Sequence, residues 1–237
     1  MRQVPYKIVN NGEMALTIIF DCPISLDLCQ RILFLQKKLR RSIRQYLLQS
    51  IPAYQSLTLC LNENSLDITA FITQQIKQIM SQMDHKYSFL GKAYIPKTIE
   101  IPVCYDAEFA TDMRTVSEHC KLSSDEIIQL HSQTTYQVYM LGFLPGFLYL
   151  GGLDKQIHCP RKAVPAFEVM AGSVGIGGEQ TGIYPVNSPG GWQIIGRTPV
   201  RLFSPSSNKP FIANPLDNVR FVVIDKQQFD KLSGQES

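Results

Sequence analysis

AGSVGIGGEQTGIYPVNSPGGWQIIGRTP, at residues 171–199, is the stretch that decides the fold of this 237-residue chain. It contains eight glycines and three prolines between short β-type runs. Turn signals at this density are typical of short strands joined by tight turns, as in a β-barrel or sandwich. A nucleotide-binding loop is disfavoured, because no Gly-Lys-Ser/Thr follows and the Gly175-Ile176-Gly177 run lacks a glycine at position 180.

The sequence around this stretch has the same β-rich character from residue 136 onward. Short β-type runs separated by Gly/Pro turns are expected at Tyr136–Leu141, Gly172–Gly178, Trp192–Gly196, Val200–Phe203 and Val219–Asp225. Just before them, Ser123 and Glu126 have the spacing of a capping box, which predicts a helix from there to His131.

The N-terminal part alternates strand and helix patterns. Strands are expected at 15–20, 54–61 and 94–103, and helices at 25–49 and 65–83, with Ser25 as N-cap of the first helix. We therefore predict an α+β protein with a small α/β sandwich at 1–90 and a β-barrel domain at 91–237.

Composition excludes several classes of function. A net charge of +3 is too small for a domain that depends on phosphate contacts, so no nucleic-acid partner is expected. The basic cluster at residues 37–44 is interpreted as a solvated helix face, with partner docking as the alternative. The longest apolar stretch, Val138–Leu153, is short for a membrane span and contains glycines and a proline, so no membrane association is expected.

The six cysteines form no CxxC pair, and the N-terminal residues contain no apolar secretory segment. Reduced thiols in a cytoplasmic protein are therefore expected. The His119-Cys120 dipeptide lacks a second pair at ligand spacing, so no metal site is predicted.

The polar residues inside the glycine-rich stretch are candidates for a concave binding site. Gln180, Tyr184 and Trp192 offer donors, acceptors and a stacking surface, as does the neighbouring Glu179. Arg161 and Arg197 are candidate clamps for a carboxylate or phosphate, because a guanidinium presents paired donors in a fixed fork. The alternatives are tight hairpins for the glycines and structural salt bridges for the two arginines.

Two residues upstream are candidate proton carriers. Glu108 follows a predicted strand together with Asp106, and in an extended segment the two carboxylates would face the same way. His131 is placed at a helix end, where the helix dipole favours a cation. A serine hydrolase is not expected, because the chain has no Gly-x-Ser-x-Gly elbow.

Four segments resemble a known family when taken in order. They are IPVCYDAEF at 101–109, LHS and the following YQVYMLGFLPGFLYLGGLD up to 154, PRKAVP at 160–165, and AGSVGIGGEQTGIYPVNSPGGWQIIGRTPVRLF at 171–203. The chain resembles the KipI / allophanate hydrolase subunit 1 family, whose better-defined members are the B subunits of 5-oxoprolinase. The resemblance is strong after about residue 95 and weak before it.

The resemblance implies a cyclophilin-like barrel in the C-terminal half and a smaller N-terminal α/β domain. It implies a homologous C subunit and an A subunit as partners, which together open 5-oxo-L-proline to L-glutamate at the cost of ATP. Because no nucleotide motif is visible, ATP is assigned mainly to a partner subunit. Glu108 or His131 would then carry the proton, and Arg161, Gln180, Tyr184, Trp192 and Arg197 would bind substrate.

Two alternatives stay open from the same resemblance. Related fused proteins are biotin-dependent carboxyltransferases, although this chain has no Met-Lys-Met for biotin attachment. Other relatives are described as inhibitors of a sporulation histidine kinase. The chain also departs from the family pattern at Ala166, where a second arginine often follows the PRxxxP motif.

Overall fold

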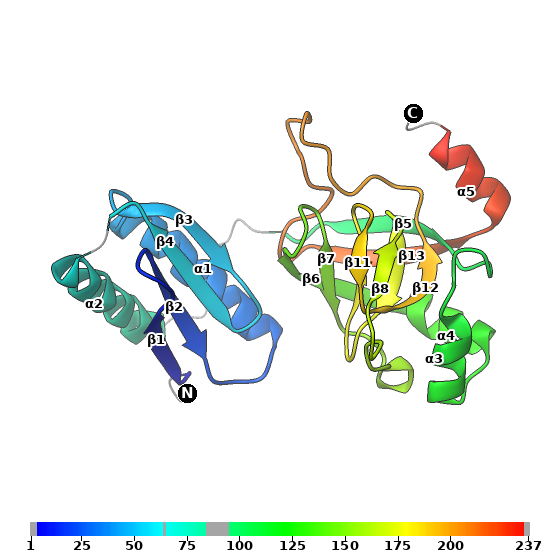
Figure 1. The fold of residues 1–237 in the computed structure, drawn as a ribbon, viewed down its shortest axis with the longest axis horizontal. Helices are drawn as coiled ribbons and strands as arrows, with labels where there is room; N and C mark the ends of the chain where they lie inside the picture. The colour runs from blue at the N-terminus through cyan, green and yellow to red at the C-terminus, as the bar shows by residue number, and fades with distance from the viewer. Residues whose placement is uncertain (1–3, 64, 84–94, 235–237) are drawn as a thin grey trace. The chain divides into compact units, whose positions relative to one another are not determined.

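The computed structural model describes residues 4–63, 65–83 and 95–234, and these form two compact units, 1–95 and 96–237 (Figure 1). The boundary expected after residue 90 lies in the segment 84–94, outside the described residues. The predicted α+β class is confirmed, because one unit combines a sheet with two helices and the other contains a closed barrel.

The N-terminal unit is an antiparallel four-stranded sheet in the order β1-β2-β4-β3 with two helices. Its elements are β1 (Tyr6–Asn10), β2 (Ala15–Phe20), α1 (Leu26–Ser42), β3 (Leu47–Pro52), β4 (Ser56–Leu61) and α2 (Leu66–Met83). Alternate residues of β2 and β4 are buried together with one side of each helix, so both helices cover the same face of the sheet. Alternation of this kind is what a half-buried strand requires.

The first helix begins as predicted but ends earlier. The Ser25 hydroxyl accepts a hydrogen bond from the Leu28 amide at 3.2 Å, which confirms the N-cap. The expected helix over 25–49 is wrong beyond Ser42, because Leu47–Pro52 instead forms the edge strand β3 against β4. Apolar residues of 47–52 satisfied the helical period in the sequence, but their pairing with β4 determines the structure.

The C-terminal unit is a closed seven-stranded barrel in the order β10-β7-β6-β13-β5-β12-β9. The barrel strands are β5 (Thr98–Cys104), β6 (Thr135–Leu141), β7 (Leu148–Gly151), β9 (Ser173–Ile176), β10 (Thr181–Ile183), β12 (Gln193–Arg197) and β13 (Asn218–Ile224). Strand β13 lies between β5, with which it is parallel, and β6, with which it is antiparallel. The predicted barrel is therefore confirmed.

Smaller elements surround the barrel. They are α3 (Met113–Cys120), α4 (Ser124–Gln133), the 3₁₀ turn η1 (Lys155–Ile157), a two-stranded ribbon of β8 (Ala166–Val169) and β11 (Ser188–Gly190), and α5 (Lys226–Ser233). The Ser123 capping box is present at the start of α4. The strand expected at 200–203 is wrong: only Phe203 forms a bridge, with Phe211, in a segment flanked by Pro199 and Pro205 that cannot donate ladder hydrogen bonds.

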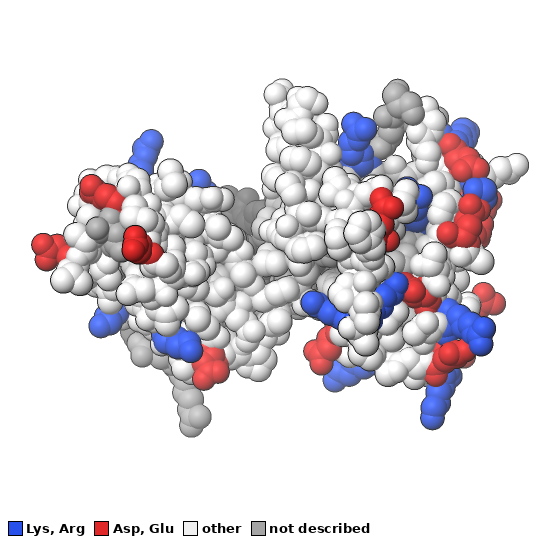
Figure 2. All heavy atoms as spheres, viewed as in Figure 1, with Lys and Arg blue, Asp and Glu red and all other residues white. Residues whose placement is uncertain are grey.

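Charged side chains are spread over the surface of each unit. On the face drawn in Figure 2, Lys and Arg are interspersed with Asp and Glu and form no continuous basic surface. In the part of the chain that the structure describes, no helix has both the length and the apolar character to cross a membrane.

Candidate functional site

An aromatic pocket of about 290 Å³ lies on the barrel unit beside the β8–β11 ribbon. Five of its eleven lining residues are aromatic, and the others are two cationic residues, two prolines and two glycines. The lining residues are Phe143, Phe147, Tyr149, Arg161, Lys162, Pro165, Tyr184, Pro189, Gly190, Gly191 and Trp192. A concave, largely apolar site with a few polar groups is the usual form of a small-molecule pocket.

The floor of the pocket is rigid because its rings pack edge to face. The Phe147 ring lies 5.4 Å from the Trp192 ring at an interplanar angle of 89°, and 5.0 Å from the Tyr184 ring at 83°. Tyr149 meets Trp192 at 5.8 Å and 71°. Perpendicular contacts place the positive edge of one ring on the negative face of another, which stabilises the cluster beyond simple burial.

Close packing against the indole explains one of the glycines in the decisive stretch. A Cβ atom added at Gly177 would overlap the Trp192 ring, with its nitrogen 2.5 Å away. A glycine there lets the backbone approach the ring directly. Gly177 therefore allows the backbone to pack directly against the Trp192 ring that lines the pocket, in addition to its role in a turn.

Arg161 brings positive charge to the mouth of the pocket. Its guanidinium carbon lies 5.7 Å from the centre of the Trp192 ring, and its side chain is exposed. Burial raises the pKa of Tyr149 and of Tyr184, and the charge of Arg161 opposes the rise in both. Among the described residues, no carboxylate forms an ion pair with Arg161, so its fork remains available for an anionic ligand.

The neighbouring Lys162 is engaged within the protein. Its ammonium group lies 2.7 Å from the Asp112 carboxylate, in a pair that is mostly shielded from solvent. The same carboxylate accepts a hydrogen bond from the Ile194 amide at 2.7 Å. Asp112 therefore ties the 160–162 segment to β12 and leaves Arg161 as the pocket cation without an internal counter-ion among the described residues.

Three of the five predicted binding residues meet in this pocket, namely Arg161, Tyr184 and Trp192. Gln180 lies instead at the β9–β10 turn, where its carbonyl accepts a hydrogen bond from the Gly177 amide at 2.9 Å. Arg197 lines a different cavity. The sequence alone could not show which of the five residues line the same cavity, because this depends on the path of the backbone in the folded protein.

Ala166 occupies the start of β8, opposite Gly190 in the ribbon. Its half-buried methyl group packs against the aromatic cluster of the pocket. This chain thus places a small apolar group beside the pocket, and Arg161 supplies the positive charge there.

His131 is fully buried inside the barrel unit, and both of its ring nitrogens are hydrogen-bonded. Nδ1 lies 2.7 Å from the Tyr105 hydroxyl and Nε2 lies 2.8 Å from the Thr181 hydroxyl. The Thr181 hydroxyl donates to the Gly175 carbonyl at 3.0 Å, so it accepts from Nε2–H, and Nδ1 accepts from Tyr105. The ring is also stacked on Phe221 at 4.6 Å.

This environment keeps His131 neutral. Burial lowers the pKa of His131 from 6.5 to about 3. The interpretation of His131 as a cation stabilised at a helix end is therefore wrong, because the loss of hydration outweighs the helix dipole. The hydrogen-bonded chain favours a structural role in the barrel, and the predicted catalytic role stays a prediction.

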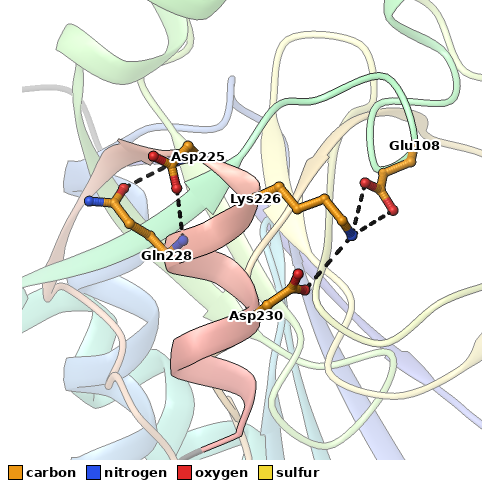
Figure 3. A network of polar contacts seen from close by, with 5 residues as sticks. All are labelled: Glu108, Asp225, Lys226, Gln228 and Asp230. Carbon is orange, nitrogen blue, oxygen red and sulfur yellow. Dashed lines mark hydrogen bonds and ion pairs between the residues drawn. The ribbon is translucent and has the colours of Figure 1, made fainter.

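Glu108 lies on the surface in a network with α5 (Figure 3). Both of its carboxylate oxygens lie 2.9 Å from the Lys226 ammonium group, which also lies 3.8 Å from Asp230. The expected extended segment with Asp106 is wrong, because the Phe109 amide donates to the Asp106 carbonyl and closes a turn. Glu108 and His131 therefore have different environments: one is an exposed ion pair and the other a buried ring.

Several pocket residues were missed from the sequence. Phe143, Phe147 and Tyr149 belong to the LGFLPGFLYL run, and their alternation around a Pro-Gly turn was the available signal. Phe143 is 66% exposed and has a φ of +68°, an unusual conformation for an aromatic residue. Within the described ranges, no three His, Cys, Asp or Glu side chains are close enough to share a metal ion.

Together, the closed barrel and the aromatic pocket beside the β8–β11 ribbon characterise the C-terminal unit of this two-unit chain. Residues 6–213 match the family described as carboxyltransferase domain, subdomain C and D. The chain belongs to this family.

Two relatives match over nearly their whole length. The B subunit of 5-oxoprolinase from Bacillus subtilis is 36% identical over 230 residues, covering 95% of this chain and 96% of the relative. The B subunit of 5-oxoprolinase from Escherichia coli O157:H7 is 39% identical over 212 residues, covering 89% and 93%. These matches confirm the family resemblance seen in the sequence.

A solved structure shares the fold at low identity. The K. lactis urea amidolyase superposes with a TM-score of 0.78 at 16% identity, covering 97% of this chain and 15% of that chain. At this identity the match supports the fold alone.

Proposed function

We propose that the chain is the B subunit of an ATP-dependent 5-oxoprolinase complex that opens 5-oxo-L-proline to L-glutamate. One observation carries this proposal for the site. Arg161 lies over Trp192 at the aromatic pocket and forms no ion pair with any described carboxylate. The similarity to two B subunits of 5-oxoprolinase, over nearly their whole length, supports the activity.

The chemistry of the substrate suits the pocket. 5-Oxo-L-proline is a small, nearly flat lactam ring with one carboxylate. The ring would lie against Trp192 and Tyr149, and the carboxylate would accept two hydrogen bonds from the Arg161 guanidinium. Holding the carboxylate positions the lactam carbonyl for activation, which is the contribution expected of a binding subunit.

An unstrained amide must be activated before water can open it, and no nucleotide-binding motif that could supply ATP is visible in the sequence of this chain. ATP would phosphorylate the amide oxygen, water would add to the activated carbon, and the ring C–N bond would break with the nitrogen leaving as the amine. A second water would then release phosphate from the resulting acyl phosphate. We assign ATP mainly to a partner subunit. The isolated chain is therefore expected to fold but to lack oxoprolinase activity. ATP-dependent glutamate formation by the purified chain alone would contradict this division of labour.

The reaction is assigned to the cytoplasm. All six cysteines are free thiols, and Cys29, Cys104 and Cys159 are buried. Free thiols of this kind suit a reducing compartment.

The decisive experiment measures turnover in the complex assembled with homologous C and A subunits. Arg161→Met removes the charge, and we expect KM for 5-oxo-L-proline to rise by about 10–100-fold, the cost of about 1.5–3 kcal/mol for a charge-assisted hydrogen bond. Arg161→Lys keeps the charge but loses the fork, so it is expected to recover only part of the affinity. The control is Arg114→Met on α3, an exposed arginine paired with Glu118.

An unchanged KM in Arg161→Met would show that the aromatic pocket does not bind the substrate. The predicted proton carriers are tested in the same complex with Glu108→Gln and His131→Asn. A loss of turnover without a fall in melting temperature would support catalysis, whereas normal turnover would leave both residues structural.

The ribbon beside the pocket offers a surface for the partner subunits. Val164, Phe167 and Met170 are apolar, and Phe167 is 93% exposed on β8. A large aromatic side chain so exposed is typical of a protein–protein contact. Phe167→Asp is expected to weaken assembly with the C subunit, measured by gel filtration, without changing the melting temperature of the chain.

A second candidate function follows from the family. The family description, carboxyltransferase domain, subdomain C and D, makes half of a biotin-dependent carboxyltransferase the second candidate, which the B-subunit relatives support less well than 5-oxoprolinase. The two candidates are separated by supplying either 5-oxo-L-proline with ATP or a carboxylated biotin carrier to the assembled complex and measuring which is consumed.

A further inference from the structure

Three residues other than glycine have a positive φ in the part of the chain that the structure describes. They are Lys121 at +57°, Phe143 at +68° and Leu216 at +76°. This left-handed region is disfavoured for L-residues, because Cβ lies too close to the following carbonyl oxygen. Each of the three conformations therefore needs a reason in the surrounding structure.

Lys121 and Leu216 have structural reasons. Lys121 is the C-cap of α3, and its amide donates to the Ser117 carbonyl, which is a usual way to end a helix. Leu216 is 2% exposed, and its amide donates to the Val138 carbonyl at 2.7 Å. Helix termination and core packing thus account for these two residues.

Neither reason applies to Phe143. It lies in the loop between β6 and β7 (Figure 1), and its side chain is largely exposed. A turn that needs a left-handed residue is best formed by glycine or asparagine. The course of the loop therefore accounts for the φ value of Phe143 but not for the aromatic side chain at this position.

The aromatic pocket accounts for the side chain. Phe143 lines this pocket together with Trp192 and Arg161. The Phe143 and Trp192 rings both meet Phe147 edge to face, at interplanar angles of 88° and 89°, with ring centres 5.9 Å and 5.4 Å away. Phe147 thus supports both rings, and the exposed surface of Phe143 is available to a ligand in the pocket.

We infer that Phe143 is a specificity-determining residue of the aromatic pocket, which covers one face of a flat ring while Arg161 holds the carboxylate of the same ligand. The inference rests on the proposed function, for which the ligand is 5-oxo-L-proline. The ring-opened product, L-glutamate, has no flat ring to cover. It would also bring an ammonium group and a second carboxylate out of water. Phe143 therefore favours the cyclic substrate over its open-chain product.

Contact with a partner subunit is the alternative role for an exposed aromatic residue, and it is the role proposed for Phe167. The two residues differ in their surroundings, because Phe167 is not among the residues that line the aromatic pocket, whereas Phe143 is. A concave site lined by other rings and one exposed arginine favours a small ligand over a protein surface.

The inference is tested in the complex assembled with the C and A subunits. Phe143→Gly removes the ring and relieves the positive φ. We expect KM for 5-oxo-L-proline to rise about 3–10-fold with kcat little changed, the value of one aromatic contact, while the chain melts no lower than wild type. The matched control is Lys121→Gly, which relieves the same kind of φ at the end of α3 and should leave KM unchanged.

Two further variants separate the ring from its bulk. Phe143→Tyr keeps an aromatic face and should retain the wild-type KM, whereas Phe143→Leu keeps an apolar side chain and should resemble Phe143→Gly. The second measurement is the inhibition constant of L-glutamate. Its ratio to KM for 5-oxo-L-proline should fall in Phe143→Gly and Phe143→Leu and stay unchanged in Phe143→Tyr.

The outcomes distinguish this inference from the proposed function. A raised KM in Arg161→Met with an unchanged KM in Phe143→Gly overturns the inference and leaves the proposed function standing. An unchanged KM in both variants contradicts the proposed function, and the inference falls with it. Equal weakening of 5-oxo-L-proline and L-glutamate in Phe143→Gly overturns the specificity role. An unchanged KM with weaker assembly, measured by gel filtration, would assign Phe143 to a partner contact and also overturn the inference.

Discussion

Replacing His131 with glutamine is expected to remove a large part of the acid sensitivity of the barrel unit. The ring is fully buried and neutral, with Tyr105 donating to Nδ1 and Nε2 donating to Thr181. Burial lowers its pKa from 6.5 to about 3, so the folded protein resists protonation over the whole interval between these values. Glutamine retains a donor and an acceptor but does not titrate.

The magnitude follows from proton linkage. Below about pH 6.5 the unfolded chain binds a proton at His131 that the folded protein does not bind until near pH 3. The stabilisation is complete above pH 6.5 and is lost as the pH falls, at up to about 1.4 kcal/mol per pH unit. Between pH 6.5 and pH 5 the free energy of unfolding is expected to fall by about 2 kcal/mol from this group alone.

Denaturant titrations at pH 7, 6 and 5 measure the effect. Trp192 is the single tryptophan of the chain and lies in the barrel unit, so its fluorescence reports unfolding of that unit. The stability difference between wild type and His131→Gln should shrink by about 2 kcal/mol on going from pH 7 to pH 5. The control His119→Gln changes an exposed histidine on α3 and should track wild type. A pH-independent difference between wild type and His131→Gln would refute the reasoning.

Three further predictions concern the barrel and its pocket. Thr181→Val leaves Nε2–H of His131 without an acceptor and should lower the free energy of unfolding by about 1–3 kcal/mol. Thr181→Ser keeps the hydroxyl and should retain most of the wild-type stability. Equal stability of the two variants would contradict the proposed hydrogen bonds of His131. Gly177→Ala should displace the Trp192 ring and shift its emission, whereas Gly234→Ala at the end of α5, whose Cβ would be no closer than 3.6 Å to its neighbours, should leave emission unchanged. Ser123→Ala removes the capping box of α4 and should lower stability by about 1 kcal/mol in a denaturant titration, and an unchanged midpoint would show that the cap is dispensable.

Local structure could be predicted from the sequence where it depends on a few neighbouring residues. The cap of α4 is an example, because the Glu126 carboxylate accepts from the Ser123 amide at 2.8 Å across three residues. Strand β3 was not predictable, because Leu47–Pro52 continues a helical pattern and becomes a strand only through pairing with β4. Short strands such as β10 consist of three residues, so their existence depends on the strands beside them.

For the candidate site, too, the residue types could be predicted from the sequence but their grouping in space could not. Arg161 and Arg197 look alike in the sequence, and only the fold shows that they line separate cavities. Tyr149 enters the aromatic pocket because β7 pairs with β10, where it faces Gly182. The buried state of His131 depends on Phe221, which lies 90 residues further along the chain by number. Contacts made over such distances leave no pattern in the local sequence.

The parallel pairing of β5 with β13 has a consequence for synthesis of the chain. Thr98–Cys104 pairs in register with Asn218–Ile224, and β13 also forms the neighbour of β6. A ribosome must therefore translate almost the whole polypeptide before the barrel can close, whereas the N-terminal unit has its own core and all of its strands by residue 61. Long-range pairing of this kind folds slowly, and the unpaired edges of β5 and β6 remain open to wrong partners until the last strand is made. Nascent chains arrested before residue 218 are thus expected to be protease-resistant in their first unit and to require chaperones for their second.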